Sequence, residues 1–295
     1  MIRRVLSLLV ALAAVVAALV VLPAATAQAA TCVTAWNSSS VYTGGQTASY
    51  SGRNYTAKWW TQNERPGSSD VWADNGACGT GGGGDGGQNN GFVVSEAQFN
   101  QMFPNRNSFY TYSGLTAALS SYPAFANSGS DAVKKREAAA FLANVSHETG
   151  GLVHIKEVNE ANYPHYCDTS QPYGCPAGQA AYYGRGPIQL SWNFNYKAAG
   201  DALGINLLAN PHLVEQNASV AWRTGLWYWN TQNGPGTMTA HNAIVNGAGF
   251  GETIRSINGS IECNGGNPAQ VQSRINKFTQ FTQILGTTTG SNLSC

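Results

Sequence analysis

The sequence predicts two folded parts of different class: a small all-β module followed by a larger, mostly α-helical domain. The division rests on the stretch from Gly79 to Gly91, which reads Gly-Thr-Gly-Gly-Gly-Gly-Asp-Gly-Gly-Gln-Asn-Asn-Gly and is typical of a flexible linker. Before it, β-forming residues alternate with turn residues; after it, apolar residues recur at helical spacing. We therefore expect a module at residues 31–79, a linker at 80–90 and a helical domain at 91–295.

Residues 1–30 are predicted to form a secretory signal peptide. They begin with Arg3 and Arg4, continue as an apolar run to Leu22 and contain an Ala-x-Ala site that ends at Ala29. A membrane anchor is the alternative, but small residues stand where an anchor would carry a basic flank. We expect a secreted, extracellular protein with no membrane contact after cleavage.

The first module is short and rich in aromatic residues. Turn signals such as Gly44-Gly45 separate its candidate strands, which favours an antiparallel arrangement. So small a core cannot bury every aromatic side chain of the segment, and exposed aromatic patches usually bind a ligand. The adjacent Trp59 and Trp60 are the strongest candidates for a binding face, and core packing of either one is the alternative.

All six cysteines follow the signal peptide. An even number in an exported chain favours disulfides over a metal site or a reactive thiol. The domain boundary then favours one bond across the module, a second that closes a loop of the helical domain, and a third that ties down the C-terminus. The expected disulfides are Cys32–Cys78, Cys167–Cys175 and Cys263–Cys295.

Three segments of the second domain carry a helical pattern. The first can be capped by Ser and Asp within residues 128–131, continues through Val145, and is stopped by the glycines that begin at Gly150. Segments 219–230 and 268–285 repeat the pattern with many aromatic residues. Strand signals are scarce, so we expect mostly helix joined by long irregular loops.

The composition indicates a neutral ligand rich in hydroxyl groups. The net charge is +1 and 11% of the residues are charged, so we expect neither nucleic acid nor an anionic membrane as a partner. The chain holds 8 Trp and 13 Tyr with many amide side chains. Aromatic rings cover the C–H faces of sugars and amides bind their hydroxyls, so a carbohydrate fits. No apolar interface stripe stands out, and we expect a monomer.

Two glutamates with different surroundings follow the first predicted helix. Glu148 continues the apolar stripe at the helix C-terminus, where burial and the helix dipole both disfavour a charged carboxylate. A neutral carboxyl suits a general acid, although a Glu that only caps the helix is the alternative. Glu157 lies beyond the glycine break in a polar segment and can return opposite Glu148 as an ionised base, with Glu160 as a rival.

Zinc is the competing interpretation of the pair His147-Glu148. The zinc protease motif needs a second His one helical turn after the first, and position 151 is Gly. We therefore expect neither a metal nor another cofactor.

Two sets of motifs are specific enough to indicate families. The module contains Ala35-Trp36, Tyr42, Gly44, Tyr50-x-Gly52, Tyr55-x-Ala57-x-Trp59-Trp60 and Pro66. This pattern resembles the chitin-binding modules of carbohydrate-binding families 5 and 12, which implies that Trp59 and Trp60 are exposed and lie on crystalline chitin. The second domain contains Ser146-His147-Glu148-Thr149-Gly150-Gly151, the run from Tyr182 to Tyr196, Leu208-Ala209-Asn210-Pro211, and Ile257 to Cys263. These segments resemble the glycoside hydrolase family 19 chitinases, in particular the streptomycete members.

The resemblance implies a lysozyme-like bilobal fold with a cleft, in which chitin is cut internally with inversion at the anomeric carbon. Glu148 matches the general acid and Glu157 the general base, which activates a water on the opposite face of the sugar. Inversion needs the two carboxyl groups about 6.5–9.5 Å apart. Ser191 matches the residue that helps to hold that water.

Further positions match residues that bind substrate or support the catalytic pair. Gln189, Asn195 and Asn258 match cleft residues that bind the sugar or its N-acetyl group, and loop-capping amides are the alternative for the first two. The remaining substrate-binding candidates are His147, Thr149, Tyr182 and Arg185. Glu262 and Arg274 match a charged pair behind the catalytic residues. Several loops of the long plant enzymes are absent from this sequence, so a shorter cleft is expected.

Two other functions compete with an endo-acting chitinase. A peptidoglycan muramidase would suit a lysozyme-like fold, but the uncharged motifs favour chitin and chito-oligosaccharides over acidic muramyl substrates. A non-catalytic chitin-binding lectin would be favoured by loss of Glu148 or Glu157, and both are present.

Overall fold

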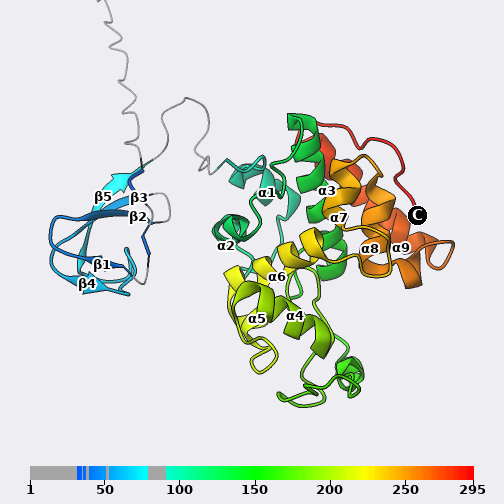
Figure 1. Ribbon diagram of the computed structural model, residues 1–295. Helices are drawn as coiled ribbons and strands as arrows, with labels where there is room; N and C mark the ends of the chain where they lie inside the picture. Colours follow the sequence, from blue (N-terminus) through cyan, green and yellow to red (C-terminus); the bar gives the residue numbers. More distant parts are fainter. Residues whose placement is uncertain (1–31, 35, 38–39, 51–52, 79–90) are drawn as a thin grey trace, which may run out of the picture. The chain divides into compact units, whose positions relative to one another are not determined.

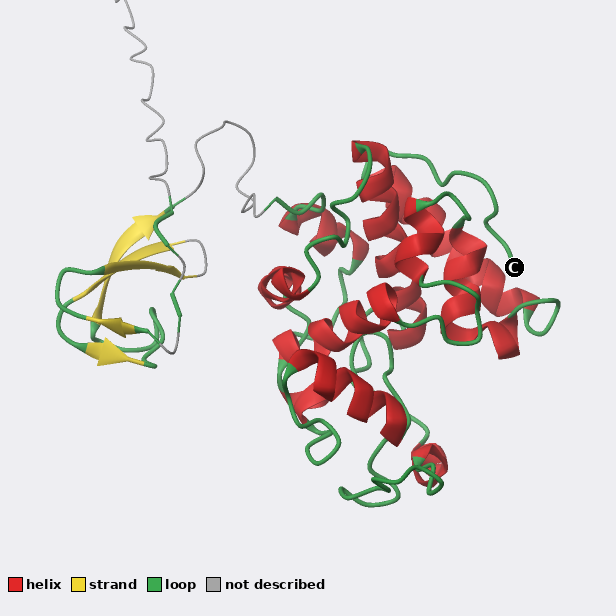
Figure 2. Cartoon of the chain, in the orientation of Figure 1, coloured by secondary structure: helices red, strands yellow, loops and turns green. Residues whose placement is uncertain are grey.

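The computed structural model describes residues 32–295 except 35, 38–39, 51–52 and 79–90 (Figure 1). The predicted signal peptide and linker lie outside the described residues. The chain divides into two compact units, and the boundary in the sequence lies between Gly81 and Gly82. Residues 50–52 are the one exception to this division, since they are grouped with the second unit. The first is built from strands and the second from helices, which confirms the predicted fold class (Figure 2).

The first unit holds two small antiparallel sheets. One has the strand order β2-β3-β5, with Tyr55 opposite Asp74, and the other pairs β1 with β4. Tyr55 and Trp72 are buried, and the Trp72 indole donates a hydrogen bond to the Glu64 carbonyl at 2.8 Å. The strands are β1 (Val41–Tyr42), β2 (Thr47–Tyr50), β3 (Arg53–Ala57), β4 (Thr61–Gln62) and β5 (Trp72–Ala77).

The second unit is built from helices joined by long loops. Its helices are α1 (Glu96–Met102), α2 (Tyr112–Ala118), η1 (Leu119–Ser121), α3 (Asp131–Thr149), η2 (Glu160–Tyr166), α4 (Asn193–Leu203), α5 (Leu213–Gln216), α6 (Ala218–Thr231), α7 (Ala240–Val245), α8 (Phe250–Glu262) and α9 (Pro268–Ile284). Where the structure describes the chain, no helix is long and apolar enough to span a membrane.

The long helix α3 shows why local signals located the helices well. The Ser130 side chain accepts the Val133 backbone N–H at its start, and Gly150 adopts the left-handed conformation at its end. The helix extends one turn beyond the expected end at Val145, because the stop signal is Gly150. Segments α6 and α9 agree with the predicted ranges to within one or two residues.

All three predicted disulfides are confirmed. Cys32 and Cys78 close the β unit, whose core is too small to be stable without a staple. The other two bonds, Cys167–Cys175 and Cys263–Cys295, close a loop and join the C-terminal residue to the end of α8.

Two separate hydrophobic cores divide the helical domain into two lobes. One core surrounds α3 and includes Phe141, Trp222 and Phe278; the other gathers residues between Tyr182 and Trp227. Figure 1 shows α3, α7, α8 and α9 side by side, with α4 and α5 at the opposite end of the domain and α6 between the two groups. Helix α6 supplies side chains to both cores and therefore couples the two lobes.

A carboxylate lies inside the first core. Glu137 of α3 is fully buried and accepts hydrogen bonds from the Trp229 indole at 3.0 Å and from the Ala126 backbone N–H at 2.9 Å. His241 of α7 lies 2.6 Å away through Nδ1, and this hydrogen bond raises the pKa of His241. The three contacts tie α3, α6 and α7 together at one buried point.

Replacing Glu137 with Ala is expected to cost about 3 kcal/mol of unfolding free energy, because it leaves buried donors without a partner. Urea unfolding followed by tryptophan fluorescence measures this loss. Because the pKa of His241 is raised by folding, its contribution is complete below the ordinary value of 6.5 and is lost as the pH rises through the folded-state value. The variant should therefore lose less stability than the parent when the pH is raised from 6 to about 9.

Glu96→Ala is the matched control, since Glu96 lies exposed in the first turn of α1. It should cost less than about 1 kcal/mol, the value of a favourable helix-dipole contact. Equal losses for both variants would contradict the role of the buried carboxylate.

Candidate active site

The end of helix α3 forms a tight reversal that carries Glu148. The Thr149 hydroxyl donates to the Val145 carbonyl and accepts the Leu152 backbone N–H, both at 2.7 Å. Gly150 and Leu152 both have positive φ, at 61° and 63°. Thr149 is fully buried and holds this turn through both hydrogen bonds. Its contact with substrate stays a prediction.

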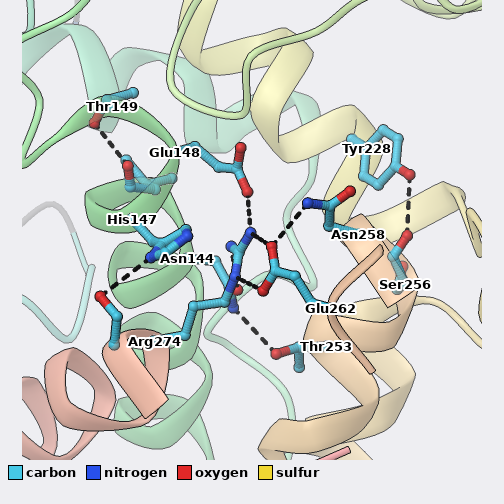
Figure 3. Close-up of polar contacts among 12 residues, drawn as sticks. Asn144, His147, Glu148, Thr149, Tyr228, Thr253, Ser256, Asn258, Glu262 and Arg274 are labelled. Atoms are coloured by element: carbon cyan, nitrogen blue, oxygen red, sulfur yellow. Dashed lines mark hydrogen bonds and ion pairs between the residues drawn. The ribbon is translucent and has the colours of Figure 1, made fainter. Parts of the chain in front are cut away.

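A buried arginine lies directly behind Glu148 (Figure 3). Arg274 of α9 donates to both oxygens of Glu262, at 2.8 and 2.7 Å, and to the Asn144 side-chain oxygen at 3.0 Å. The same guanidinium also contacts one oxygen of Glu148. The predicted charged pair of Glu262 and Arg274 is thus adjacent to Glu148, and it joins α3, α8 and α9.

The arginine is shared unequally between two carboxylates. Glu262 takes two hydrogen bonds in a forked arrangement, whereas Glu148 takes one. Burial alone would raise the pKa of Glu262, but the hydrogen bonds and charge of Arg274 lower it below its ordinary value, with help from the Asn258 amide. Glu262 is therefore an anion near pH 7 and shares the same cation with Glu148.

The environment of Glu148 differs from the apolar one expected from the helical stripe. Its side chain is 17% exposed and contacts the Arg274 guanidinium directly, so a cation lies where an apolar surrounding was expected. The correction arises because Arg274 stands 126 positions away in the sequence, where no helical period can reveal it.

Asn258 interrupts helix α8 beside this cluster. Its backbone leaves the helical region, with φ −142° and ψ 29°, and its amide donates to Glu262 at 2.8 Å. Just before it, the Ser256 carbonyl accepts the Tyr228 hydroxyl at 3.0 Å. Burial and then the nearby charge of Glu148 raise the pKa of Tyr228 to about 12, so this phenol stays neutral. The amide of Asn258 is thus oriented by the same network that holds Glu148.

Two members of the cluster, Asn144 and Tyr228, were not among the sequence-based candidates. Asn144 precedes Glu148 by one helical turn and is fully buried, bonding the Thr253 hydroxyl at 3.1 Å. The sequence did contain a signal for Asn144, because an amide residue on the apolar face of a predicted helix is unusual. Tyr228 offered no comparable signal, because it lies in the aromatic run of α6.

His147 is directed toward helix α9, where its Nδ1 lies 3.3 Å from the Ser273 hydroxyl. Burial, and after it the charge of Arg274, lowers its pKa, so the imidazole is neutral near pH 7. In the part of the chain that the structure describes, no group of three or more His, Cys, Asp or Glu side chains is arranged to hold a metal ion.

Glu157 stands in a different, strongly hydrogen-bonding environment. Its Oε1 accepts the Asn162 amide at 2.8 Å and the Tyr166 hydroxyl at 3.0 Å, and its Oε2 faces the Gly184 backbone N–H at 3.4 Å. Burial and the charge of Glu157 raise the pKa of Tyr166 to about 12, which keeps this donor protonated. The rival Glu160 has a side chain that is 74% exposed and meets Lys156 only at 3.9 Å. The geometry therefore favours Glu157 over Glu160 as the fixed carboxylate.

The loop after Arg185 and the first turn of helix α4 carry three further predicted residues, Gln189, Ser191 and Asn195. The Gln189 amide donates to the Gly186 carbonyl and the Asn195 amide to the Ser191 carbonyl, each at 3.0 Å. Gln189 has φ 51°, an unusual value for a residue with a side chain. Both amides therefore cap backbone carbonyls. The side chains of Gln189, Ser191 and Asn195 remain partly exposed.

Two other candidates are interior supports of the second lobe. Tyr182 is fully buried, and its hydroxyl donates to the Leu208 carbonyl at 2.8 Å. Arg185 is 3% exposed, donates to the Tyr196 hydroxyl at 2.8 Å and forms an ion pair with Glu215 at 3.2 Å. Both side chains support the second lobe in this structure, and their contact with substrate stays a prediction.

The β unit exposes the two adjacent tryptophans. Trp59 is 55% and Trp60 60% exposed, whereas Trp72 is buried. The chain bends at Lys58 and Trp59, directly after β3, and both rings remain exposed. Lys58 lies 5.9 Å from the Trp59 ring. An exposed aromatic pair on a small domain is suited to bind an extended surface.

Comparisons with known proteins agree with both parts of the chain. Residues 93–295 match the family model for glycoside hydrolase family 19, described as chitinase class I, and residues 35–73 match carbohydrate-binding module family 5/12. Endochitinase A of Zea mays is 45% identical over 210 residues, which cover 69% of this chain and 71% of that protein. Endochitinase B of Zea mays is 45% identical over 188 residues, 63% of each chain.

Solved structures give the same result. Chitinase C from Streptomyces griseus HUT6037 is 84% identical, with a TM-score of 0.69 over 90% of this chain and 100% of that one. A class IV family 19 chitinase from Zea mays is 44% identical, with a TM-score of 0.61 over 69% of this chain and 98% of that one. The chain therefore belongs to the family 19 chitinases and carries an N-terminal carbohydrate-binding module of family 5/12.

Proposed function

We propose that this protein is a secreted endo-chitinase that hydrolyses β-1,4 bonds between N-acetylglucosamine units with inversion at the anomeric carbon. The observation that carries the proposal is the contrast between two partly buried glutamates of a family 19 domain. Glu148 shares one arginine with a competing carboxylate, whereas Glu157 is held by neutral donors. The three disulfides and the N-terminal sequence support export.

In the proposed mechanism Glu148 is the general acid. It gives its proton to the oxygen of the scissile bond as the bond to the anomeric carbon breaks, and it becomes a carboxylate. The Arg274 guanidinium already touches this side chain, so it stabilises the negative charge as that charge develops. Because Glu262 holds Arg274 in place by two hydrogen bonds, the cation needs no reorganisation during the step.

Glu157 is the proposed general base. Its Oε1 is occupied by two donors at 2.8 and 3.0 Å, whereas its Oε2 has only the long contact to the Gly184 N–H. The second oxygen is thus the one with free capacity to take a proton from water. The resulting hydroxide joins the anomeric carbon on the face opposite the leaving group, with Ser191 as the proposed water-holding residue.

The β module is proposed to bind chitin through Trp59 and Trp60. One buried indole contributes about 2–3 kcal/mol, so two rings give weak binding on their own. A tethered catalytic domain converts weak binding into a high local concentration of substrate.

The first prediction from this mechanism concerns Glu148 and Glu157. Glu148→Gln and Glu157→Gln should each lower kcat by about 10²–10⁴-fold, because each removes one proton transfer. Chitin hexasaccharide hydrolysis followed by NMR should show α-anomers first for the parent. Glu160→Gln is the matched control and should keep near-parent activity, since its side chain is exposed.

If Glu160→Gln lost activity while Glu157→Gln kept it, the general base would be Glu160 and the present assignment would be wrong. β-Anomers formed first would refute inversion. A parent that binds chitin without hydrolysing the hexasaccharide would point to the lectin alternative.

A second prediction concerns the hydrogen bonds from Arg274 to Glu262. Glu262→Gln removes the charge that holds Arg274 by two hydrogen bonds, so the guanidinium is no longer fixed against Glu148 and kcat should fall by about tenfold or more. Hydrolysis of chitin hexasaccharide at saturating substrate measures kcat.

Glu252→Gln is the matched control, because Glu252 lies on the same helix and pairs with Arg255 at 3.2 Å. Its kcat should equal that of the parent. An unchanged kcat in Glu262→Gln would contradict the proposed role of Glu262 in holding Arg274.

A third prediction tests the module. Trp59→Ala and Trp60→Ala should each weaken binding of the full chain to crystalline chitin by about tenfold or more. Hydrolysis of the soluble hexasaccharide should not change. Val41→Ala, an exposed apolar residue of the same module, is the control and should bind like the parent; unchanged binding in both tryptophan variants would refute the assignment.

A further inference from the structure

One tryptophan of the helical domain is exposed while the others are in the cores. Trp192 is 36% exposed, whereas Trp222, Trp227 and Trp229 are 2% exposed or less. Trp192 immediately follows Ser191 and immediately precedes helix α4. Exposing so large an apolar ring costs hydration free energy, which is recovered when a ligand covers it.

The backbone at Trp192 is also unfavourable for its residue type. Its φ is 76° and its ψ 135°, a region that suits glycine and disfavours bulky side chains. Holding such a conformation costs on the order of 1–3 kcal/mol. A glycine would relieve the strain, so the indole is present in spite of a local cost.

The ring is backed by other aromatic side chains. Its plane lies nearly parallel to Phe194, with centroids 5.6 Å apart and an angle of 21°. Tyr166 meets it edge-on, at 5.7 Å and 89°. The hydroxyl of Tyr166 donates to Glu157 at 3.0 Å, so a single residue separates the indole from the proposed base.

The neighbouring residues hold the loop rigidly. The Trp192 backbone N–H donates to the Tyr182 carbonyl at 2.9 Å. Asn193 is fully buried, and its side chain bonds the backbone N–H and carbonyl of Asp168 and the carbonyl of Gly174 at 2.9–3.0 Å. The indole is therefore preorganised, which lowers the entropy cost of binding.

We propose that Trp192 is a sugar-stacking platform, on which one N-acetylglucosamine ring of the bound chito-oligosaccharide lies beside Glu157. The inference rests on the proposed function and adds a binding residue to that same site. A pyranose has an apolar C–H face that can lie on an indole, and Ser191 directly precedes the platform in the chain.

The test measures binding and stability separately. All variants are made in the full chain with Glu148→Gln, which stops hydrolysis, and with Trp59→Ala and Trp60→Ala, which remove the module's exposed rings. Calorimetric titration with chitin hexasaccharide should give a dissociation constant about tenfold or more higher for Trp192→Gly than for this background. Trp192→Tyr should keep most of the affinity, since it preserves an aromatic face.

Thermal unfolding separates stacking from a structural role. Trp192→Gly should unfold at a higher temperature than Trp192→Ala, because only glycine relieves the positive φ. The hexasaccharide should protect the background protein from acrylamide quenching of its tryptophan fluorescence, and this protection should disappear in Trp192→Tyr. The quenching measurement decides the question even where Trp192→Gly fails to fold.

The outcomes are distinguishable. Equal affinity in the background and in Trp192→Gly, or protection that persists in Trp192→Tyr, overturns the platform alone. No hexasaccharide binding by the background, together with no hydrolysis by the parent, overturns the proposed function and the platform with it.

Discussion

The buried guanidinium of Arg274 is the contact on which the catalytic arrangement depends. A cation without access to water is tolerated only when acceptors surround it, and removing one partner of such a group costs several kcal/mol. Its acceptors come from α3 and α8, while the arginine itself stands on α9. The three helices are therefore held at the separation that the guanidinium sets. Glu148 gains a fixed position and a fixed counter-charge from the same constraint.

The second glutamate depends on a different part of the molecule. Glu157 lies beyond the Thr149 turn and takes its hydrogen bonds from Asn162, Tyr166 and Gly184. Gly184 belongs to the loop that the buried Arg185 supports from the second core. The two carboxylates are thus positioned by different lobes. Helix α6 packs into both cores and therefore holds one lobe against the other.

Part of the backbone strain lies where the site is assembled. Leu152, Gln189 and Trp192 have positive φ in segments that carry a proposed functional residue, whereas other such residues, including Asn63 and Asn292, lie elsewhere. Such conformations persist because the surrounding hydrogen bonds and packing over-determine them. The strain is balanced by the well-packed cores and by buried contacts such as that of Glu137 with Trp229.

Features that depend on near neighbours were predictable from the amino-acid sequence. The cap at Ser130, the stop at Gly150 and the extent of α9 after Pro268 follow from local backbone chemistry, and the fold class followed from periodicity and the glycine stretch. The family motifs added Glu262 and Arg274, which spacing could not relate to Glu148. The contacts between distant side chains, Arg274 with Glu148 and Tyr166 with Glu157, and the burial of Thr149 and Tyr182 became visible in the folded structure alone. These contacts join separate helices and loops, so they depend on how the elements pack, and a local pattern of residues does not encode that geometry.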